Sequence, residues 1–407
     1  MTNKDFNFIH FKKEIFNKED NLLKDLKVNK KMIKYWDYLR EYKKLKHEIL
    51  NSVNKVFESG TLLFGQELIK FEKNFCKFNN SKYGIGVGSG TDALFIALKA
   101  LGVGIGDEVI TVSNTAIPTV ASIINTGAKV RFVDIGKDSL MDIKKIKDAI
   151  NSKTKVIVPV HLFGQTCDMS GILSISKKYN LKIVEDCAQA CGALYKNQKA
   201  GSIGDIGCYS FYPTKILGAY GDGGFLTTNN KKLYEKMHRL RFYGIDTLNK
   251  NKKWSNKYYS IDHGVNSRLD EIQASILNLK MKYINSFINK RRSIAQKYFM
   301  ELKELDIEMP IVNKKNFHVF HIFAVSHPRR ELILKKMRSK NINLNIHYPY
   351  PIHTMKAYKK FTYGKCNYLF ETEKKAKMIF SLPIYPSINN YEIESIIQNI
   401  NKIVSKI

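Results

Sequence analysis

The sequence predicts an α/β protein in which a mostly parallel, doubly wound sheet is followed by a smaller α+β domain. Three observations support this prediction. Strand-like and helix-like stretches alternate from about residue 83 to 187. The strand-like stretches are short and almost wholly apolar, as in parallel sheets that are covered by helices on both faces. After "GGFLTT" (223–228) the alternation gives way to long helical stretches at about 266–305.

The expected elements follow in chain order. A helix whose apolar residues recur at Leu68, Phe71, Phe75 and Phe78 precedes the sheet. Strands are expected at 83–88, 108–112, 129–135, 155–160 and 182–187, and helices at 91–101, 118–125, 142–150 and 169–179. Because ligands of such sheets bind beyond the carboxyl ends of the strands, functional residues are expected there.

The length of 407 residues exceeds what one ordinary core needs, so we expect two domains. Residues 1–31 are polar and lysine-rich, a composition that favours a disordered N-terminal extension. A large α/β domain is expected over 32–295. A small α+β domain is expected over 296–407, with "VFHIFAVS" (319–326) as a strand and a closing helix at 391–404. The boundary near 295 falls within a helix.

Composition bounds the function. The formal net charge of +30 suggests a nucleic-acid partner, but the lysines are spread along the chain and no arginine-rich tract appears. A lysine-coated surface that attracts an anionic substrate is the preferred interpretation. No apolar run approaches the roughly 18 to 20 residues of a membrane span, and the N-terminus lacks a secretory core. A cytoplasmic protein without a membrane partner is therefore expected.

The six cysteines show no Cys-x-x-Cys spacing and no accompanying histidine pair. The ligands of zinc sites usually show such spacing in the sequence, so no metal is expected. Free thiols in a reducing compartment are the expected state.

A glycine-rich turn, "GVGSGTDAL" (86–94), leaves a strand and enters a helix. The N–H groups at such a helix start form an anion site, with Thr91 and Asp92 beside it. The turn alone is a weak signal, since many are only structural. The carboxylate of Asp92 would repel a phosphate, so its N–H is expected to face the anion.

Two further stretches carry chemical groups. "LKIVEDCAQACGA" (181–193) ends a strand with Glu185 and Asp186, where a carboxylate can cap a turn or keep a heterocyclic nitrogen protonated. "SFYPTKILGAYGDGG" (210–224) surrounds Lys215 with small residues. A buried amine is less readily protonated and can attack an aldehyde. A phosphate turn, a strand-end aspartate and a lysine, in this order, are typical of a pyridoxal-phosphate (PLP) enzyme.

The chain resembles the DegT/DnrJ/EryC1/StrS family of nucleotide-sugar aminotransferases from about residue 32 to the C-terminus. The resemblance rests on ordered motifs that include "GSGTDAL", "GVGIGDEVIT", "VPVHLFGQ", "VEDCAQACGA", "SFYPTKILGAYGDGG", "HGVNSRLDEIQASIL" and "IHYPYPIH". It implies the aspartate aminotransferase (type I) fold and PLP as the cofactor.

The resemblance also implies roles for single residues. Lys215 resembles the lysine that bonds to the cofactor and moves the proton, and Asp186 the partner of the ring nitrogen. The other cofactor-binding positions are Gln189 near the ring hydroxyl, Thr91, Asp92 and Ser210 at the phosphate, and Asn266, which reaches the phosphate of the neighbouring subunit of a homodimer. Arg268, His347 and Tyr348 match positions that meet the nucleotide-sugar, although Arg268 could instead pair only with Asp270 and "HYP" could only turn the chain.

Two positions depart from the family pattern. Many relatives place an aromatic ring over the cofactor where this chain has Ala116, so either another group covers that face or the cofactor is held less tightly. Many relatives also have histidine where this chain has Cys191.

The implied reaction moves the amino group of L-glutamate to a keto group of a nucleotide-linked deoxy sugar, for amino-sugar or glycan biosynthesis. "YGDGG" and "IHYPYPIH" resemble the branch that aminates carbon 3, with a 6-deoxy-3-keto sugar on dTDP as the favoured substrate and a UDP-sugar as the runner-up. Amination at carbon 4, a dehydratase and a regulatory or nucleic-acid-binding protein are the alternatives. Lys215 argues against the dehydratase, in which histidine replaces the lysine.

Overall fold

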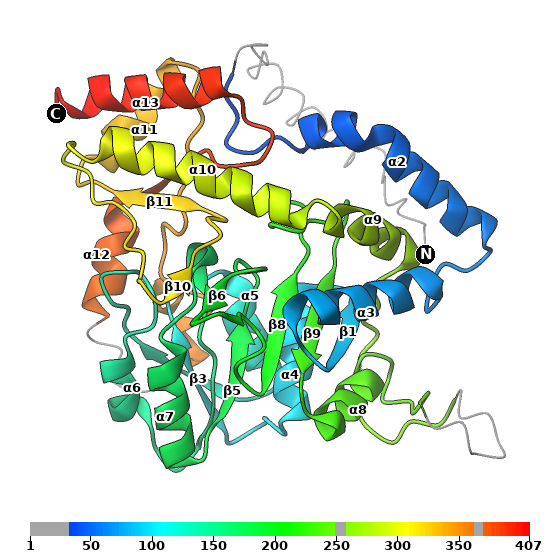
Figure 1. The fold of residues 1–407 in the computed structure, drawn as a ribbon. Helices are drawn as coiled ribbons and strands as arrows, with labels where there is room; N and C mark the ends of the chain where they lie inside the picture. The colour runs from blue at the N-terminus through cyan, green and yellow to red at the C-terminus, as the bar shows by residue number, and fades with distance from the viewer. Residues whose placement is uncertain (1–31, 249–257, 362–368) are drawn as a thin grey trace, which may run out of the picture.

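The computed structural model describes residues 32–248, 258–361 and 369–407, so the expected extension at 1–31 lies outside the described residues. At its centre is a seven-stranded sheet of order β1-β9-β8-β5-β4-β2-β3 (Figure 1). Its strands are β1 (Tyr83–Val87), β2 (Glu108–Val112), β3 (Lys129–Val133), β4 (Thr154–Ile157), β5 (Lys182–Asp186), β8 (Ile206–Ser210) and β9 (Gly224–Thr228). Neighbours from β8 to β3 are parallel, whereas β9 is antiparallel to both β8 and β1. The prediction of a mainly parallel sheet is confirmed.

Helices cover both faces of this sheet. Successive residues of its strands point to opposite faces, and both sets are apolar, so both faces need cover. Val109 and Val156 pack on the face covered by α4 (Gly90–Ala100), α5 (Ile117–Asn125) and α8 (Lys231–Leu240). Ile110 and Ile157 pack on the opposite face with α6 (Ile143–Ala149) and α7 (Met169–Tyr179). Two more helices, α3 (Gln66–Asn79) and α9 (Glu271–Met281), cover β8 and β9 on that second side.

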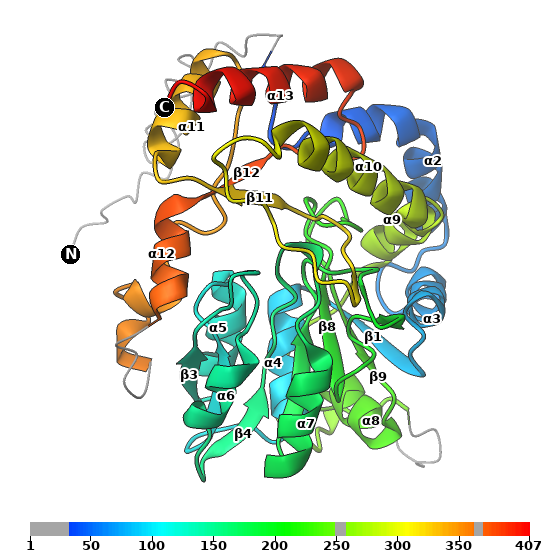
Figure 2. The ribbon, with the colours of Figure 1, turned by 60° about the vertical axis from the view of Figure 1, so that its left-hand side comes forward.

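The C-terminal part is built on a two-stranded antiparallel sheet, β11 (Phe323–Ser326) with β12 (Ile379–Leu382) (Figure 2). Helices α10 (Ile284–Leu302), α11 (Arg330–Ser339) and α13 (Asn390–Val404) pack on it around a separate apolar core. The closing helix is thus confirmed, but the strand predicted over 319–326 starts only at Phe323. The N–H groups of Val319 and Ile322 bond to the carbonyls of Gly164 and Phe163 in a loop instead of to a strand.

One helix contributes to both parts of the molecule. Helix α10 places Ile284 and Ile288 in the core beside β8 and β9, and Ile294 and Tyr298 in the C-terminal core. Ile33, close to the start of the described chain, also packs in the C-terminal core. The remaining elements are α2 (Tyr38–Glu58), α12 (Phe370–Met378), the short strands β6 (Leu194–Tyr195), β7 (Gln198–Lys199) and β10 (Asn316–Phe317), and the 3-10 turns η1 (Leu162–Gly164), η3 (Ile352–Thr354) and η4 (Lys359–Phe361).

Within the described ranges, no helix combines the length and the apolar character that a membrane crossing requires. Five cysteines are described and all are free thiols, which agrees with the expected state; Cys366 lies outside the described residues.

Candidate active site

Lys215 lies in a tight turn that follows the carboxyl end of β8. The turn is closed by hydrogen bonds from the Lys215 N–H to the Tyr212 carbonyl (2.8 Å) and from the Ala219 N–H to the Phe211 carbonyl (2.7 Å). A Cβ atom at Gly218 would lie 2.3 Å from the Pro213 carbonyl oxygen, so this position requires glycine. The small residues around Lys215 therefore allow the chain to turn back on itself beside the lysine.

Burial lowers the pKa of Lys215 to about 8, while the nearby carboxylate of Asp186 acts in the opposite direction. Desolvation disfavours the ammonium form, which explains the direction of this shift. At pH 7 about a tenth of the amine is then unprotonated, far more than at the ordinary lysine pKa. Lys215 can serve as a nucleophile and as an acid–base group, as the sequence predicts.

Asp186 ends β5 and is held by two donors. The Thr119 hydroxyl donates to its Oδ2 (2.7 Å), and the Ala188 N–H donates to its Oδ1 (3.1 Å). Burial raises the pKa of Asp186, whereas these hydrogen bonds and the charge of Lys215 lower it. A carboxylate oxygen can accept two hydrogen bonds, so each oxygen keeps one position for a further donor.

A second hydroxyl extends this arrangement. Thr115 Oγ1 lies 2.8 Å from Thr119 Oγ1, and because Thr119 donates to Asp186, Thr115 is the donor between the two threonines. Both threonines are buried. Sequence reasoning missed them, although both lie shortly after β2 in the chain: Thr115 is in the loop just before the N-cap residue Ala116, and Thr119 is in the first turn of α5.

Replacing Thr119 with valine keeps the shape of the side chain and removes the hydroxyl. We expect turnover to fall roughly 10- to 150-fold, since a hydrogen bond to a charged group is worth about 1.5 to 3 kcal/mol. The T119S variant keeps the hydroxyl and should restore most of the rate. The measurement is kcat for both variants, with the melting temperature of each measured to show that it is folded. Equal rates for T119V and the unmodified protein would show that the threonine only packs.

Glu185, the other strand-end carboxylate, points away from Asp186 because consecutive strand residues face opposite sides. Its Oε1 accepts the N–H groups of Ile203 and Gly204, and its Oε2 accepts the Gly201 N–H and faces His161 Nε2 at 2.9 Å. Glu185, His161 and Cys187 are buried close together, as metal ligands often are. All four acceptor positions of Glu185 are already used, so this carboxylate holds the loop at 201–204.

The turn that the sequence predicts as an anion site lies at the start of α4. The Ser89 hydroxyl caps the Asp92 N–H (3.1 Å), and the first main-chain bond of the helix runs from the Ala93 N–H to the Ser89 carbonyl. The N–H groups of Gly90 and Thr91 precede that bond. A Cβ atom on Gly90 would lie 2.7 Å from Ser210 Cβ, so the turn lies directly against Ser210.

The structure places Asp92 differently from the expectation that its N–H would face an anion. That N–H donates to Ser89, and the carboxylate accepts the Ser267 hydroxyl (2.7 Å). The donors left for an anion are therefore the N–H groups of Gly90 and Thr91, together with the Ser210 hydroxyl. Asp92 instead ties the turn to the segment that carries Asn266 and Arg268.

Gln189, in the loop after β5, connects the large sheet with Tyr348 of the C-terminal part. Gln189 Nε2 donates to the Tyr348 hydroxyl (2.8 Å), while Gln189 Oε1 accepts the Phe163 N–H (2.7 Å). His347 Nδ1 lies 2.9 Å from the Ser381 hydroxyl. Burial, assisted by the charge of Lys215, lowers the pKa of His347 to about 4, so its imidazole is neutral near neutral pH. His347 and Tyr348 thus adjoin the groups around Lys215.

Asn266 and Arg268 are not brought into this group. Asn266 is exposed, and Arg268 is half-buried with its guanidinium 5.8 Å from the ring centre of Phe242. Asp270 caps the Gln273 N–H at the start of α9 (2.8 Å), and no ion pair joins it to Arg268 among the described residues. The alternative in which Arg268 serves only to pair with Asp270 therefore loses its support.

A family model described as the DegT/DnrJ/EryC1/StrS aminotransferase family matches residues 43–401. The chain belongs to this family. It is 42% identical over 376 residues to the dTDP-3-amino-3,4,6-trideoxy-alpha-D-glucose transaminase of Micromonospora megalomicea subsp. nigra, covering 91% of this chain and 98% of that protein. It is 40% identical to the dTDP-3-amino-3,6-dideoxy-alpha-D-galactopyranose transaminase of Aneurinibacillus thermoaerophilus, covering 91% and 99%.

Among solved structures, S. venezuelae DesV in complex with a ketimine intermediate superposes with a TM-score of 0.87 at 33% identity, covering 92% of this chain and 99% of that one. The aminotransferase thus has the fold of its PLP-dependent family, and it is itself a PLP-dependent transaminase.

The residues present fit PLP. The N–H groups of Gly90 and Thr91 with the Ser210 hydroxyl would hold the phosphate, Asp186 has acceptor positions left for the ring nitrogen, and Lys215 is the amine that would hold the aldehyde carbon. When bound, PLP supplies an aldehyde for amines and a ring that withdraws electrons from the carbon being deprotonated.

The two departures from the family pattern have clear places in the aminotransferase. Ala116 is the N-cap residue of α5, directly after Thr115. Cys191 is buried in the core around α3, and burial raises the pKa of its thiol to about 12, so it is a packing group.

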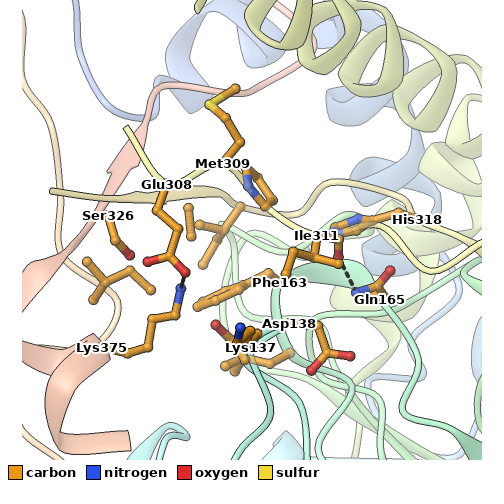
Figure 3. A pocket seen from close by; sticks show the side chains of 16 residues that line it. Lys137, Asp138, Phe163, Gln165, Glu308, Met309, Ile311, His318, Ser326 and Lys375 are labelled. Atoms are coloured by element: carbon orange, nitrogen blue, oxygen red, sulfur yellow. Dashed lines mark hydrogen bonds and ion pairs between the residues drawn. The ribbon is translucent and has the colours of Figure 1, made fainter. Parts of the chain in front are cut away.

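A small cavity of about 20 Å³ lies between the large sheet and the C-terminal part (Figure 3). It can hold about one water molecule. Beside it, Lys375 Nζ pairs with Glu308 Oε1 (2.5 Å) and Gln165 Nε2 donates to the Ile311 carbonyl (3.0 Å). None of the predicted site residues lines this cavity.

Proposed function

We propose that this aminotransferase moves the amino group of L-glutamate to carbon 3 of a keto sugar linked to a nucleotide, with dTDP as the favoured nucleotide. One observation carries the proposal. Lys215 and Asp186 lie close to Gln189, Tyr348 and His347, beyond the carboxyl ends of strands β5 and β8. Further support comes from the two relatives, whose names describe transaminases of dTDP-linked 3-amino sugars.

In this proposal, Lys215 Nζ takes a proton from the α-carbon of glutamate, and in the second half of the reaction it returns a proton to the carbon of the sugar that receives the amine. A pKa of about 8 suits a group that must both accept and donate near neutral pH. Asp186 remains ionised against a protonated ring nitrogen, which favours the electron-withdrawing form of the cofactor. Neutral His347 and the Tyr348 hydroxyl orient the sugar.

The choice of carbon 3 rests on the turn "YGDGG" as well as on the relatives. The Tyr220 N–H of this turn donates to Gln273 Oε1 of α9 (2.9 Å), so a helix fixes its position. The sugar ketone must lie about 3 to 3.5 Å from the attacking amine. A reaction at carbon 4, the alternative, would therefore require a different placement of the sugar ring in the site.

Matched 3-keto and 4-keto sugars on dTDP and on UDP test this proposal. With glutamate as the donor, we expect the 3-keto dTDP-sugar to turn over at least about tenfold faster than the others, which is about 1.4 kcal/mol of discrimination. NMR of the product locates the new amine. Turnover of only the 4-keto sugar would move the reaction to carbon 4.

We also propose a homodimer that shares its active sites, in which Asn266 reaches the phosphate of the partner subunit. Its exposure in the single chain and its position next to Ser267, which bonds Asp92, support this proposal. When K215A and N266A proteins are mixed, we expect mixed dimers with one intact site and up to a quarter of the unmodified activity per subunit. Light scattering gives the subunit number. Activity in a monomer, or no recovery on subunit exchange, would contradict the shared site.

A further inference from the structure

A cavity of about 480 Å³ lies beside the Lys215 turn. Tyr212 and Thr214 of the turn line one part of it, and Arg291, His321 and His347 line another. The cations Lys34 and Arg291 both border it, but none of the described residues that line it is aspartate or glutamate. Such a lining suits an anionic group.

Arg291 is the main charge in this lining. Its side chain is only 3% exposed, and its Nη1 donates to the carbonyls of His321 (3.1 Å) and Ile384 (2.5 Å). Its Nε has no hydrogen-bond partner among the described residues. Burial lowers the pKa of Arg291 to about 10, so it remains charged at neutral pH.

No carboxylate of the described chain neutralises this charge. Glu41, which acts on Arg291 from a distance, forms its own ion pair with Lys280 at 2.6 Å. A buried cation without a counter-charge is costly, and a bound anion would remove that cost.

His321 provides a second unused polar atom. It is 7% exposed, and its Nδ1 has no hydrogen-bond partner among the described residues. Burial, together with the charges of Lys215 and Arg291, keeps the pKa of His321 well below its usual range, and neutral His347 lies beside it. The imidazole is therefore neutral and lies among these three groups, where it can contact a ligand that reaches from Lys215 towards Arg291.

We propose that this cavity is the subsite for the side-chain carboxylate of the amino donor, which pairs with Arg291 and contacts His321. The inference rests on the proposed function, because it specifies how that reaction selects glutamate. Lys215 does not itself line the cavity, so the part of the donor that enters is remote from the α-carbon on which Lys215 acts. A nucleotide phosphate is the other anion that could supply the same chemistry, and the test separates the two.

The first test uses the unmodified holoenzyme and needs no turnover. Glutarate has the carbon spacing and both carboxylates of glutamate but no amine, and glutaramate replaces one carboxylate with an amide of similar shape. By calorimetric titration we expect glutarate to bind at least about tenfold more tightly than glutaramate, the effect of one ion pair in a partly desolvated site. Equal affinities would overturn the proposal.

The second test compares two adjacent arginines. R291M should lose the preference for glutarate, and R291K should keep a weaker preference because the charge remains but the donor geometry changes. R292M is the matched control, since Arg292 lies on the ring of Phe317 (4.0 Å), donates to the His318 carbonyl and does not line the cavity. It should keep the preference. A folded R291M or R291K protein that binds glutarate as the unmodified protein does would overturn the proposal.

The source of the anion is decided by titrating the same proteins with dTDP. We expect R291M to bind dTDP as the unmodified protein does, whereas weakened dTDP binding with unchanged glutarate binding would assign the cavity to the nucleotide and refute the donor subsite. A failure of the proposed function would give a different result from a failure of the donor subsite. In that case the unmodified holoenzyme would not transfer an amino group from glutamate to any keto sugar, whatever the ratio of glutarate to glutaramate affinity.

Discussion

Replacing Lys215 with alanine is expected to abolish turnover, by roughly 10³- to 10⁴-fold or more, because it removes both the nucleophile and the proton-transfer group. The fold should persist, since the turn is closed by main-chain bonds of Lys215 and Ala219 that alanine retains. Cofactor should still bind noncovalently, through the α4 helix start and Asp186. The measurements are kcat, the absorption of bound cofactor and the melting temperature.

Lys199 supplies the control for this variant. Lys199 lies in β7, outside the active site. Burial lowers its pKa as well, and its Nζ lies 4.3 Å from the ring centre of Phe78. K199A should therefore keep the activity. If a pure preparation of K215A turned over at near the unmodified rate, the assignment of the lysine would be wrong.

Asp186→Asn has the second largest expected effect. Asparagine keeps the shape, and its oxygen can still accept the Ala188 N–H, so the turn after β5 should survive. The charge that stabilises a protonated ring nitrogen is lost, and we expect turnover to fall roughly 10²- to 10³-fold, as for other preorganised electrostatic groups. The measurements are single-turnover rates with glutamate and the melting temperature.

Glu185→Gln separates the two carboxylates. Glutamine cannot accept from all four donors around Glu185, so this variant should lose stability by about 1 to 3 kcal/mol through unpaired buried groups. Its folded fraction should retain the chemical step. If instead D186N kept most of its rate and E185Q lost it, Asp186 would be only a cap and Glu185 the functional group.

The sequence alone determined the groups that depend on local chain geometry. Short apolar strands and glycine turns indicated the positions of β1, β2 and β5. Asp186 ends β5, the start of α4 follows β1, and the turn that carries Lys215 follows β8. A strand end and the turn after it lie a few residues apart in the chain, so their chemistry can be predicted from that stretch. The motif order then indicated the family, which the comparison confirmed.

Only the tertiary structure decided which distant side chains act on these groups. Thr119 meets Asp186 across 67 positions, because α5 follows β2 and β2 lies two strands from β5 in the sheet. Alternation along β5 sends Glu185 to a loop and Asp186 to the site, and composition does not reveal which face is which. Arg291 lines a cavity only because α10 spans both cores. Contacts of this kind depend on sheet order and helix packing, which are set by the burial of the whole chain rather than by any short stretch of it.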